Sequence, residues 1–128
     1  MSQEKVESLR RGYEAFNRRD IDAALEGLDP EVEWPNMLEG TTIRGHQAIR
    51  DYWTRQFQLT ASRVDPEEFI EMGDRVVVVV HQVVRDSHGT LLTDHRVAHV
   101  YAFRDERVAR MDVYENKDEA LEAVGLRE

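Results

Sequence analysis

Two histidines, His95 and His99, lie four residues apart within residues 92–104, where apolar and polar side chains alternate. This alternation predicts a β-strand, in which positions four apart point to the same face, here together with Val97 and Tyr101. An imidazole among apolar side chains can exchange a proton near neutral pH, as an enolisation or an aldol ring closure requires. We therefore take His99 first, and His95 with it, as candidate acid–base residues; a hydrogen-bonded core histidine is the alternative.

A third histidine, His81, joins this face if the preceding hairpin has a simple register. Residues 87–89 have the sequence of a tight turn, and if Asp86 pairs with Thr90 across it, His81 falls opposite His95. Neighbouring imidazoles lower one another's basicity, so the group would contain a neutral base. The pattern thus predicts three histidines on one face.

Glu115 is the fourth candidate, at the end of the last predicted strand, which covers residues 107–115. Alternation places Ala109, Met111, Val113 and Glu115 inside, so this carboxylate could act as a base or a hydrogen-bond acceptor at the mouth of a pocket. A carboxylate that is solvated, or that caps the following helix, is the plainer alternative.

The same side chains could instead bind a metal ion. His81, His95 and His99, with Glu115 as a fourth ligand, offer donor atoms that suit zinc or another divalent ion. Their spacing matches no compact metal motif, however, and the chain contains no cysteine. We therefore expect no metal and no other cofactor.

Aromatic side chains are predicted to wall a pocket around these groups. Trp34, Trp53, Phe57 and Tyr101 would offer flat apolar surfaces suited to a ring-bearing ligand, although aromatic residues at helical spacing also fill ordinary cores. The side chains expected to contact a small, largely apolar molecule are Tyr13, Phe16, Trp34, Trp53, Phe57, Val97, Tyr101, Met111 and Val113.

Length and composition limit the classes to which the chain can belong. Its 128 residues, with 41% hydrophobic and 34% charged side chains, suit one globular domain over residues 1–128. The 17 Lys and Arg residues against 26 Asp and Glu give a net charge of −9, which disfavours nucleic acid and anionic membranes as partners. Without cysteine, and with a charged N-terminal segment, the protein is expected to be cytoplasmic.

Hydrophobic periodicity predicts the elements that position these residues. An apolar stripe at helical spacing indicates a first helix, and Asp20 can cap a second helix that extends to Leu28. Residues 32–34 alternate and suggest a short edge strand, whereas residues 36–44 are expected to form a loop. Gly45 then precedes a third helix with a broad aromatic face.

Four consecutive antiparallel strands follow, and Asn116 can cap a final helix that ends at Gly125. Helices followed by a strand meander predict an α+β fold, in which a curved antiparallel sheet packs on the N-terminal helices around an internal pocket. Residues 76–80 are all valine, and a sheet covered on one side does not need apolar side chains on both faces. We therefore predict a homodimer joined through the convex face, with Val78 among the outward side chains.

The order and spacing of these features resemble the NTF2-like superfamily, and in particular its SnoaL-like branch of polyketide cyclase and isomerase-type proteins. The resemblance spans nearly the whole chain. It rests on the segments YEAFNRRD at 13–20, VEW at 32–34, IRGHQAI at 43–49, and residues 108–121. It implies a cone of curved sheet capped by helices, with a cavity at the open end, and usually a homodimer.

The resemblance also indicates where catalytic groups would stand. Ketosteroid isomerases of this superfamily place a base aspartate where Trp34 stands here. Their oxyanion donors are a tyrosine that aligns near Gly12, beside Tyr13, and an inward carboxylic acid that aligns with His99. None of the three is retained, so isomerisation by that set is not expected. Polyketide cyclases use an inward acid–base residue in the last two strands, where His99 or Glu115 can stand.

Limonene-epoxide-hydrolase-like members use two aspartates and an arginine. Asp94, Arg96 and Asp112 have these types, but alternation points them outward. We interpret the chain as a small-molecule-binding SnoaL-like protein, a cofactor-independent cyclase or isomerase that uses acid–base catalysis on an apolar ring-bearing substrate. A non-catalytic ligand-binding or protein-association module is the alternative, and an epoxide-hydrolase-like hydrolase a further one.

Overall fold

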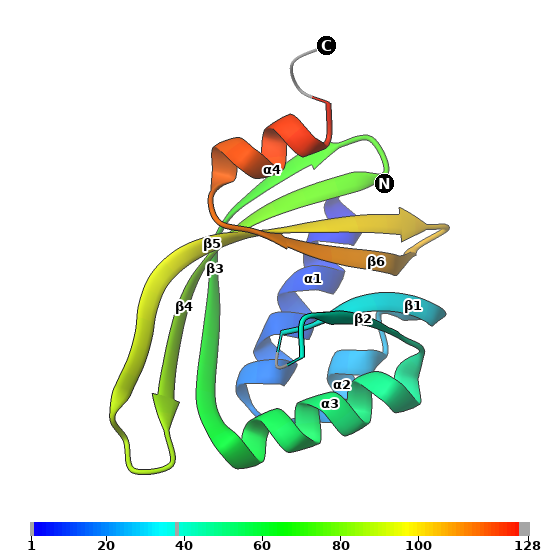
Figure 1. The fold of residues 1–128 in the computed structure, drawn as a ribbon. Helices are drawn as coiled ribbons and strands as arrows, with labels where there is room; N and C mark the ends of the chain where they lie inside the picture. The colour runs from blue at the N-terminus through cyan, green and yellow to red at the C-terminus, as the bar shows by residue number, and fades with distance from the viewer. Residues whose placement is uncertain (1, 38, 126–128) are drawn as a thin grey trace.

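A strongly curved sheet organises the structure (Figure 1). The computed structural model describes residues 2–37 and 39–125, which form four helices and six strands. The elements are α1 (Ser2–Asn17), α2 (Ile21–Leu25), β1 (Leu28–Asn36), β2 (Thr41–Arg44), α3 (His46–Leu59), β3 (Thr60–Met72), β4 (Arg75–Asp86), β5 (Leu91–Arg104), β6 (Arg107–Tyr114) and α4 (Lys117–Ala123). The strand order is β2-β1-β6-β5-β4-β3, and β1 runs parallel to β6 while the other neighbours are antiparallel. The sheet is therefore mixed rather than purely antiparallel.

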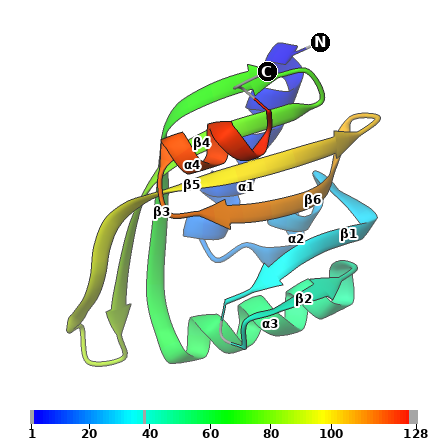
Figure 2. The same ribbon diagram turned by 45° about the horizontal axis from the view of Figure 1, so that its top comes forward.

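The helices lie on both sides of this sheet. α1, α2 and α3 lie on its concave side, and α4 lies on the convex side (Figures 1 and 2). Each side has its own cluster of buried apolar side chains, the larger one under α1, α2 and α3. This is the predicted α+β arrangement, with N-terminal helices packed on a curved sheet. None of the helices in the described residues has the length and apolar character that crossing a membrane requires.

The second helix is shorter than predicted. Asp20 caps α2 as expected, because its carboxylate accepts a hydrogen bond from the Ala23 amide at 3.2 Å. Leu28, however, begins β1 instead of continuing the helix. The Gly27 carbonyl accepts a hydrogen bond from the Val108 amide at 2.9 Å, which ties the chain to β6 at this point.

The first strand is an inner strand, and the prediction that it forms an edge is wrong. Residues 41–44, which were expected in a loop, form the edge strand β2 beside it. Glu33 of β1 pairs with Arg44 of β2, and the guanidinium donates to the carboxylate at 2.8 Å. Four residues are too few for periodicity to reveal a strand. Gly45 follows with φ 89°, a left-handed conformation that favours glycine before α3.

A β-bulge changes the register of the β4–β5 hairpin. The Asp86 amide donates to the Thr90 carbonyl at 2.9 Å, which confirms the predicted turn. Immediately beyond the turn, Leu92 has no partner, and the register shifts by one residue. His81 consequently points to the convex side of the sheet, so the prediction that it lies opposite His95 is wrong.

A second bulge lies in β6. Ala109 has no pairing partner in β5 and is only partly buried. Beyond the bulge, Met111 lies opposite Tyr101, and Val113 lies opposite His99. These two side chains point inward, as alternation predicts.

Most of the apolar run at residues 76–80 is covered by other elements of the same chain, whereas Val79 stays partly exposed. The even-numbered members of the run lie in the core under α1, α2 and α3, whereas Val77 packs with Ala120 of α4. Val78 therefore points inward, and its predicted outward position is wrong. Because α4 covers Val77, the run does not by itself require a partner subunit, and the homodimer stays a prediction.

Candidate functional site

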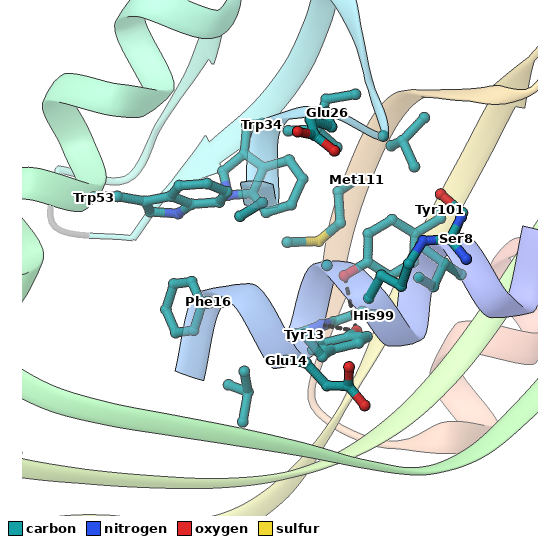
Figure 3. A pocket seen from close by; sticks show the side chains of 18 of the residues that line it. Ser8, Tyr13, Glu14, Phe16, Glu26, Trp34, Trp53, His99, Tyr101 and Met111 are labelled. Atoms are coloured by element: carbon teal, nitrogen blue, oxygen red, sulfur yellow. Dashed lines mark hydrogen bonds between the residues drawn. The ribbon is translucent and has the colours of Figure 1, made fainter. Parts of the chain in front are cut away.

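A cavity of about 990 Å³ lies between the concave face of the sheet and the helices α1, α2 and α3 (Figure 3). The predicted residues that line it are Tyr13, Phe16, Trp34, Trp53, His99, Tyr101, Met111 and Val113. Two other predicted contacts do not line it. Phe57 packs against Phe16 with ring centroids 5.1 Å apart, and Val97 is buried in the core.

Three buried polar side chains form a hydrogen-bonded chain at this cavity. The Tyr101 hydroxyl of β5 donates to the Tyr13 hydroxyl of α1 at 2.8 Å. The Tyr13 hydroxyl lies 2.8 Å from Nδ1 of His99, and the two rings are nearly parallel, with centroids 5.9 Å apart. The sequence places all three residues inside but gives no indication of this chain, which joins positions 86 residues apart.

The direction of these hydrogen bonds decides which nitrogen of His99 carries the proton. Because Tyr101 donates to Tyr13, the proton of Tyr13 is free to be donated to Nδ1, which leaves the imidazole proton on Nε2. No partner for Nε2 is found among the described residues, and none of their fully buried side-chain nitrogens and oxygens lacks a partner. Nε2 therefore reaches the open space of the cavity.

Burial keeps these groups uncharged. Desolvation lowers the pKa of His99 to about 4, because a charged imidazolium would lose its hydration in this interior. Burial raises the pKa of Tyr13 well above its usual value, and it also raises the pKa of Tyr101. At neutral pH the cavity thus presents a neutral imidazole rather than a cation.

Aromatic side chains wall the space beside this polar chain (Figure 3). Trp34 of β1 and Trp53 of α3 meet edge to face, with centroids 5.6 Å apart and planes at 88°. Phe16 of α1 packs on Trp53 in a similar way, also at 5.6 Å. Because these rings support one another, they offer a pre-formed apolar surface to a flat ligand.

The other two candidate histidines lie outside the cavity. Nε2 of His81 lies 2.6 Å from a carboxylate oxygen of Asp94 on the convex side, a position that follows from the bulge at Leu92. His95 is exposed, near the end of the β4–β5 hairpin that projects away from the helices (Figure 1). The three histidines therefore do not form one group, and they cannot exchange protons with one another at a single site.

Glu115 does not line the cavity either. β6 ends at Tyr114, and Asn116 caps α4 by accepting a hydrogen bond from the Glu119 amide at 2.9 Å. Glu115 therefore lies exposed in the connection between the two elements, which corrects its predicted inward position. Within residues 2–37 and 39–125, no three His, Cys, Asp or Glu side chains come close enough together to hold a metal ion.

The residues considered for epoxide hydrolysis lie on the convex face, as alternation predicts. Asp94 contacts His81, and Arg96 donates to Glu67 at 2.6 Å. Asp112 accepts from Arg110 at 2.9 Å. These side chains contact other polar side chains on the surface and do not line the cavity.

Ser62 of β3 and Gln82 of β4 are among the polar side chains of the cavity wall that the sequence interpretation missed. Ser62 is 1% exposed. Residues two apart on a strand point to the same face, so the inward position of Ser62 follows from that of Val64. The inward position of Gln82 follows in the same way from that of Val80. Both positions passed unnoticed because neither residue type stands out by itself as a catalytic group.

This combination of a curved sheet, helices on its concave side and an internal cavity defines the NTF2-like class of folds, also described as cystatin-like. A model of the SnoaL-like domain matches residues 9–111, and the chain therefore belongs to this family of the NTF2-like superfamily. No curated protein matches the sequence.

Solved structures support the same assignment. An NTF2-like protein of unknown function from Burkholderia pseudomallei is 28% identical, with a TM-score of 0.79 over 95% of this chain and 98% of that one. TerC, co-crystallized with polyporic acid, is 31% identical, with a TM-score of 0.79 over 93% and 96% of the two chains. A proposed polyketide cyclase from Xanthomonas campestris is 26% identical, with a TM-score of 0.74 over 96% and 98%.

Proposed function

We propose that this protein binds a small, ring-bearing molecule in its cavity and catalyses a cofactor-independent isomerisation or cyclisation by proton transfer at His99. The observation that carries the proposal is the orientation of this imidazole. Its Nδ1 is held by Tyr13, while Nε2 faces a cavity walled by aromatic rings. A neutral imidazole in this position can act on a substrate that the aromatic walls orient.

Nε2 can act as a proton donor or as a proton acceptor, because the hydrogen bonds between Tyr101, Tyr13 and His99 can run in either direction. With Tyr13 donating to Nδ1, Nε2 carries the proton and can donate it to a carbonyl oxygen. In the reversed chain, Nδ1 donates to Tyr13, which donates to Tyr101, and Nε2 can accept a proton from a carbon beside a carbonyl. Isomerisation returns this proton to another carbon, and an intramolecular aldol closure passes it to the new alkoxide. Neither reaction needs an oxidant or a cofactor.

The low basicity of His99 limits the substrates that can react. Burial lowers its pKa to about 4, so Nε2 is a weak base and removes only acidic carbon-bound protons. Protons between two carbonyl groups, or between a carbonyl group and an aromatic ring, have this property. The proposed polyketide cyclase among the related structures, and the co-crystallization of TerC with polyporic acid, are consistent with a ring-bearing carbonyl compound in this cavity.

Deuterium exchange tests the catalytic step. Proton NMR in D2O should show that the protein accelerates the loss of the carbonyl-adjacent protons of 2-tetralone, a ring-bearing ketone. His99→Asn should reduce the catalysed rate about a hundredfold, as expected for removal of an acid–base group, whereas His95→Asn, an exposed control on the same strand, should not. No acceleration by the wild type, or equal acceleration by His99→Asn, would contradict the proposal.

A non-catalytic binding protein is the second candidate. It is favoured by the self-contained chain of Tyr101, Tyr13 and His99, which satisfies both phenols without a substrate. This alternative predicts binding of polyporic acid in a calorimetric titration, weakened by Trp53→Ala, with no exchange activity on any ketone. Binding together with exchange that depends on His99 would exclude it.

We also propose that the protein forms a homodimer through the convex face of its sheet. Support comes from the outward side of β4 beyond α4, where Val79 and Val83 remain partly exposed. Light scattering at micromolar concentration should give twice the mass of the chain, and Val79→Asp should shift it to the monomer because a charge would enter an apolar contact. A wild-type monomer would contradict the proposal.

A further inference from the structure

The wall of the cavity contains a polar group that has no hydrogen-bond partner among the described residues. Ser62 of β3 is 1% exposed and lines the cavity, yet its hydroxyl makes no hydrogen bond with any described residue. No fully buried side-chain oxygen in the described ranges lacks a partner, so the Ser62 hydroxyl must reach the open space. A buried hydroxyl without a partner carries a free-energy cost that a bound group can remove.

A second neutral polar side chain lies beside it. Gln82 of β4 pairs with Val64, two positions from Ser62 in β3, and both Ser62 and Gln82 line the cavity. No hydrogen bond to a described residue is found for the Gln82 carboxamide. Together the two side chains offer a hydroxyl and an amide, which can both donate and accept.

The strand that carries Ser62 is firmly held. Asn17, at the end of α1, donates to the Val64 carbonyl at 2.8 Å and accepts from the Val64 amide at 2.9 Å. This two-way bond fixes β3 against α1, two residues from Ser62. The polar pair therefore lies on a positioned strand rather than on a loop.

The pair Ser62 and Gln82 lies at a different position along the sheet from the hydrogen-bonded residues at His99. His99 lies opposite Val78 of β4, and Gln82 is four residues further along β4, so about 13 Å of strand lies between the two sites. Aromatic rings such as Phe16 and Trp53 line the same cavity.

We propose that Ser62 and Gln82 form a second subsite, which binds an uncharged hydroxyl or carbonyl oxygen at the far end of the ligand. The ligand class is then an elongated aromatic molecule with an apolar middle and a neutral oxygen at each end, one at His99 and one at Ser62 and Gln82. This inference rests on the proposed function, because it assumes that ring-bearing molecules occupy the cavity. An uncharged end group follows from the absence of charge on both side chains of the subsite.

A matched pair of probes tests the subsite. The compounds 4-phenylphenol and 4,4′-dihydroxybiphenyl share one apolar body and differ in the second hydroxyl. In calorimetric titrations the dihydroxy compound should bind about fivefold more tightly, the gain expected from one neutral hydrogen bond. Ser62→Ala or Gln82→Leu should reduce this preference, whereas Ser87→Ala, in the exposed hairpin turn, should leave it unchanged.

Thermal melting separates a binding role from a structural one. Because the Ser62 hydroxyl has no partner in the described part of the chain, Ser62→Ala should leave the Tm unchanged or raise it while the preference for the second hydroxyl is lost. Equal binding of both probes by the wild type, or a preference that survives both substitutions, would overturn the subsite but not the proposed function. If neither probe binds, the proposed function and the subsite both fail.

Discussion

Acidification should lower the free energy of unfolding because of His99. Burial lowers the pKa of this imidazole from its ordinary value of 6.5 to about 4. In the unfolded chain the imidazole is hydrated and takes up a proton as the pH falls below 6.5, whereas the folded protein does not until the pH approaches 4. The contribution to stability is therefore present above pH 6.5 and is lost as the pH falls toward 4.

The two pKa values set the size of this effect. Proton uptake by the unfolded chain alone lowers the free energy of unfolding by about 2 kcal/mol between about pH 7.5 and about pH 5. This loss is a large fraction of the roughly 5–15 kcal/mol by which folded domains are stable. Other groups also titrate in this range, so the effect of His99 must be isolated by a variant.

His99→Asn provides this variant. The side-chain oxygen of asparagine can occupy the place of Nδ1 and accept from Tyr13, but it does not titrate. Urea denaturation of the wild type and the variant at both pH values should show that the variant loses about 2 kcal/mol less on acidification. His95→Asn, an exposed control on the same strand, should behave as the wild type. Equal losses in the wild type and His99→Asn would refute the description of His99 as a buried neutral group.

Three further predictions concern the cavity and the elements around it. Tyr13→Phe should lower the free energy of unfolding by about 2 kcal/mol in urea denaturation, because it leaves both His99 and Tyr101 without their buried partner. Asn17→Ala should cost about 2 kcal/mol in the same measurement through the loss of both bonds to Val64, and Asn17→Asp should also destabilise the fold, because it places a carboxylate oxygen against the Val64 carbonyl. Dialysis against a chelator should leave the Tm unchanged, and a large decrease would point to a bound metal.

Alternation along β5 was sufficient to place His99 and Tyr101 inside, because a strand covered on one face must direct every second side chain into the core. The same rule failed for His81. The bulge at Leu92 shifts the pairing by one residue, and a one-residue shift exchanges the two faces. Nothing in the local sequence marks Leu92 as a bulge, since the flanking residues carry no glycine or proline signal.

The chain from Tyr101 through Tyr13 to His99 was not predictable for a different reason. Tyr13 lies on α1, and its contact with β5 depends on where the whole helix settles on the sheet. Periodicity identifies the buried face of a helix but not the strand residue that it meets. The inward positions of these residues were therefore predictable separately, and their hydrogen bonds were not.

The polar groups of the cavity are of two kinds: some have a hydrogen-bond partner within the fold, and others have none among the described residues. Tyr13 and Tyr101 are paired within the fold, so they stabilise the folded state with or without a ligand. Nε2 of His99 and the hydroxyl of Ser62 have no partner among the described residues, and each reaches the open space. A ligand that forms hydrogen bonds with both groups removes the free-energy cost of leaving them unpaired. An apolar ligand of the same shape does not remove this cost. We therefore expect affinity for rings to arise from the aromatic walls, and discrimination among ring compounds to arise from these two atoms.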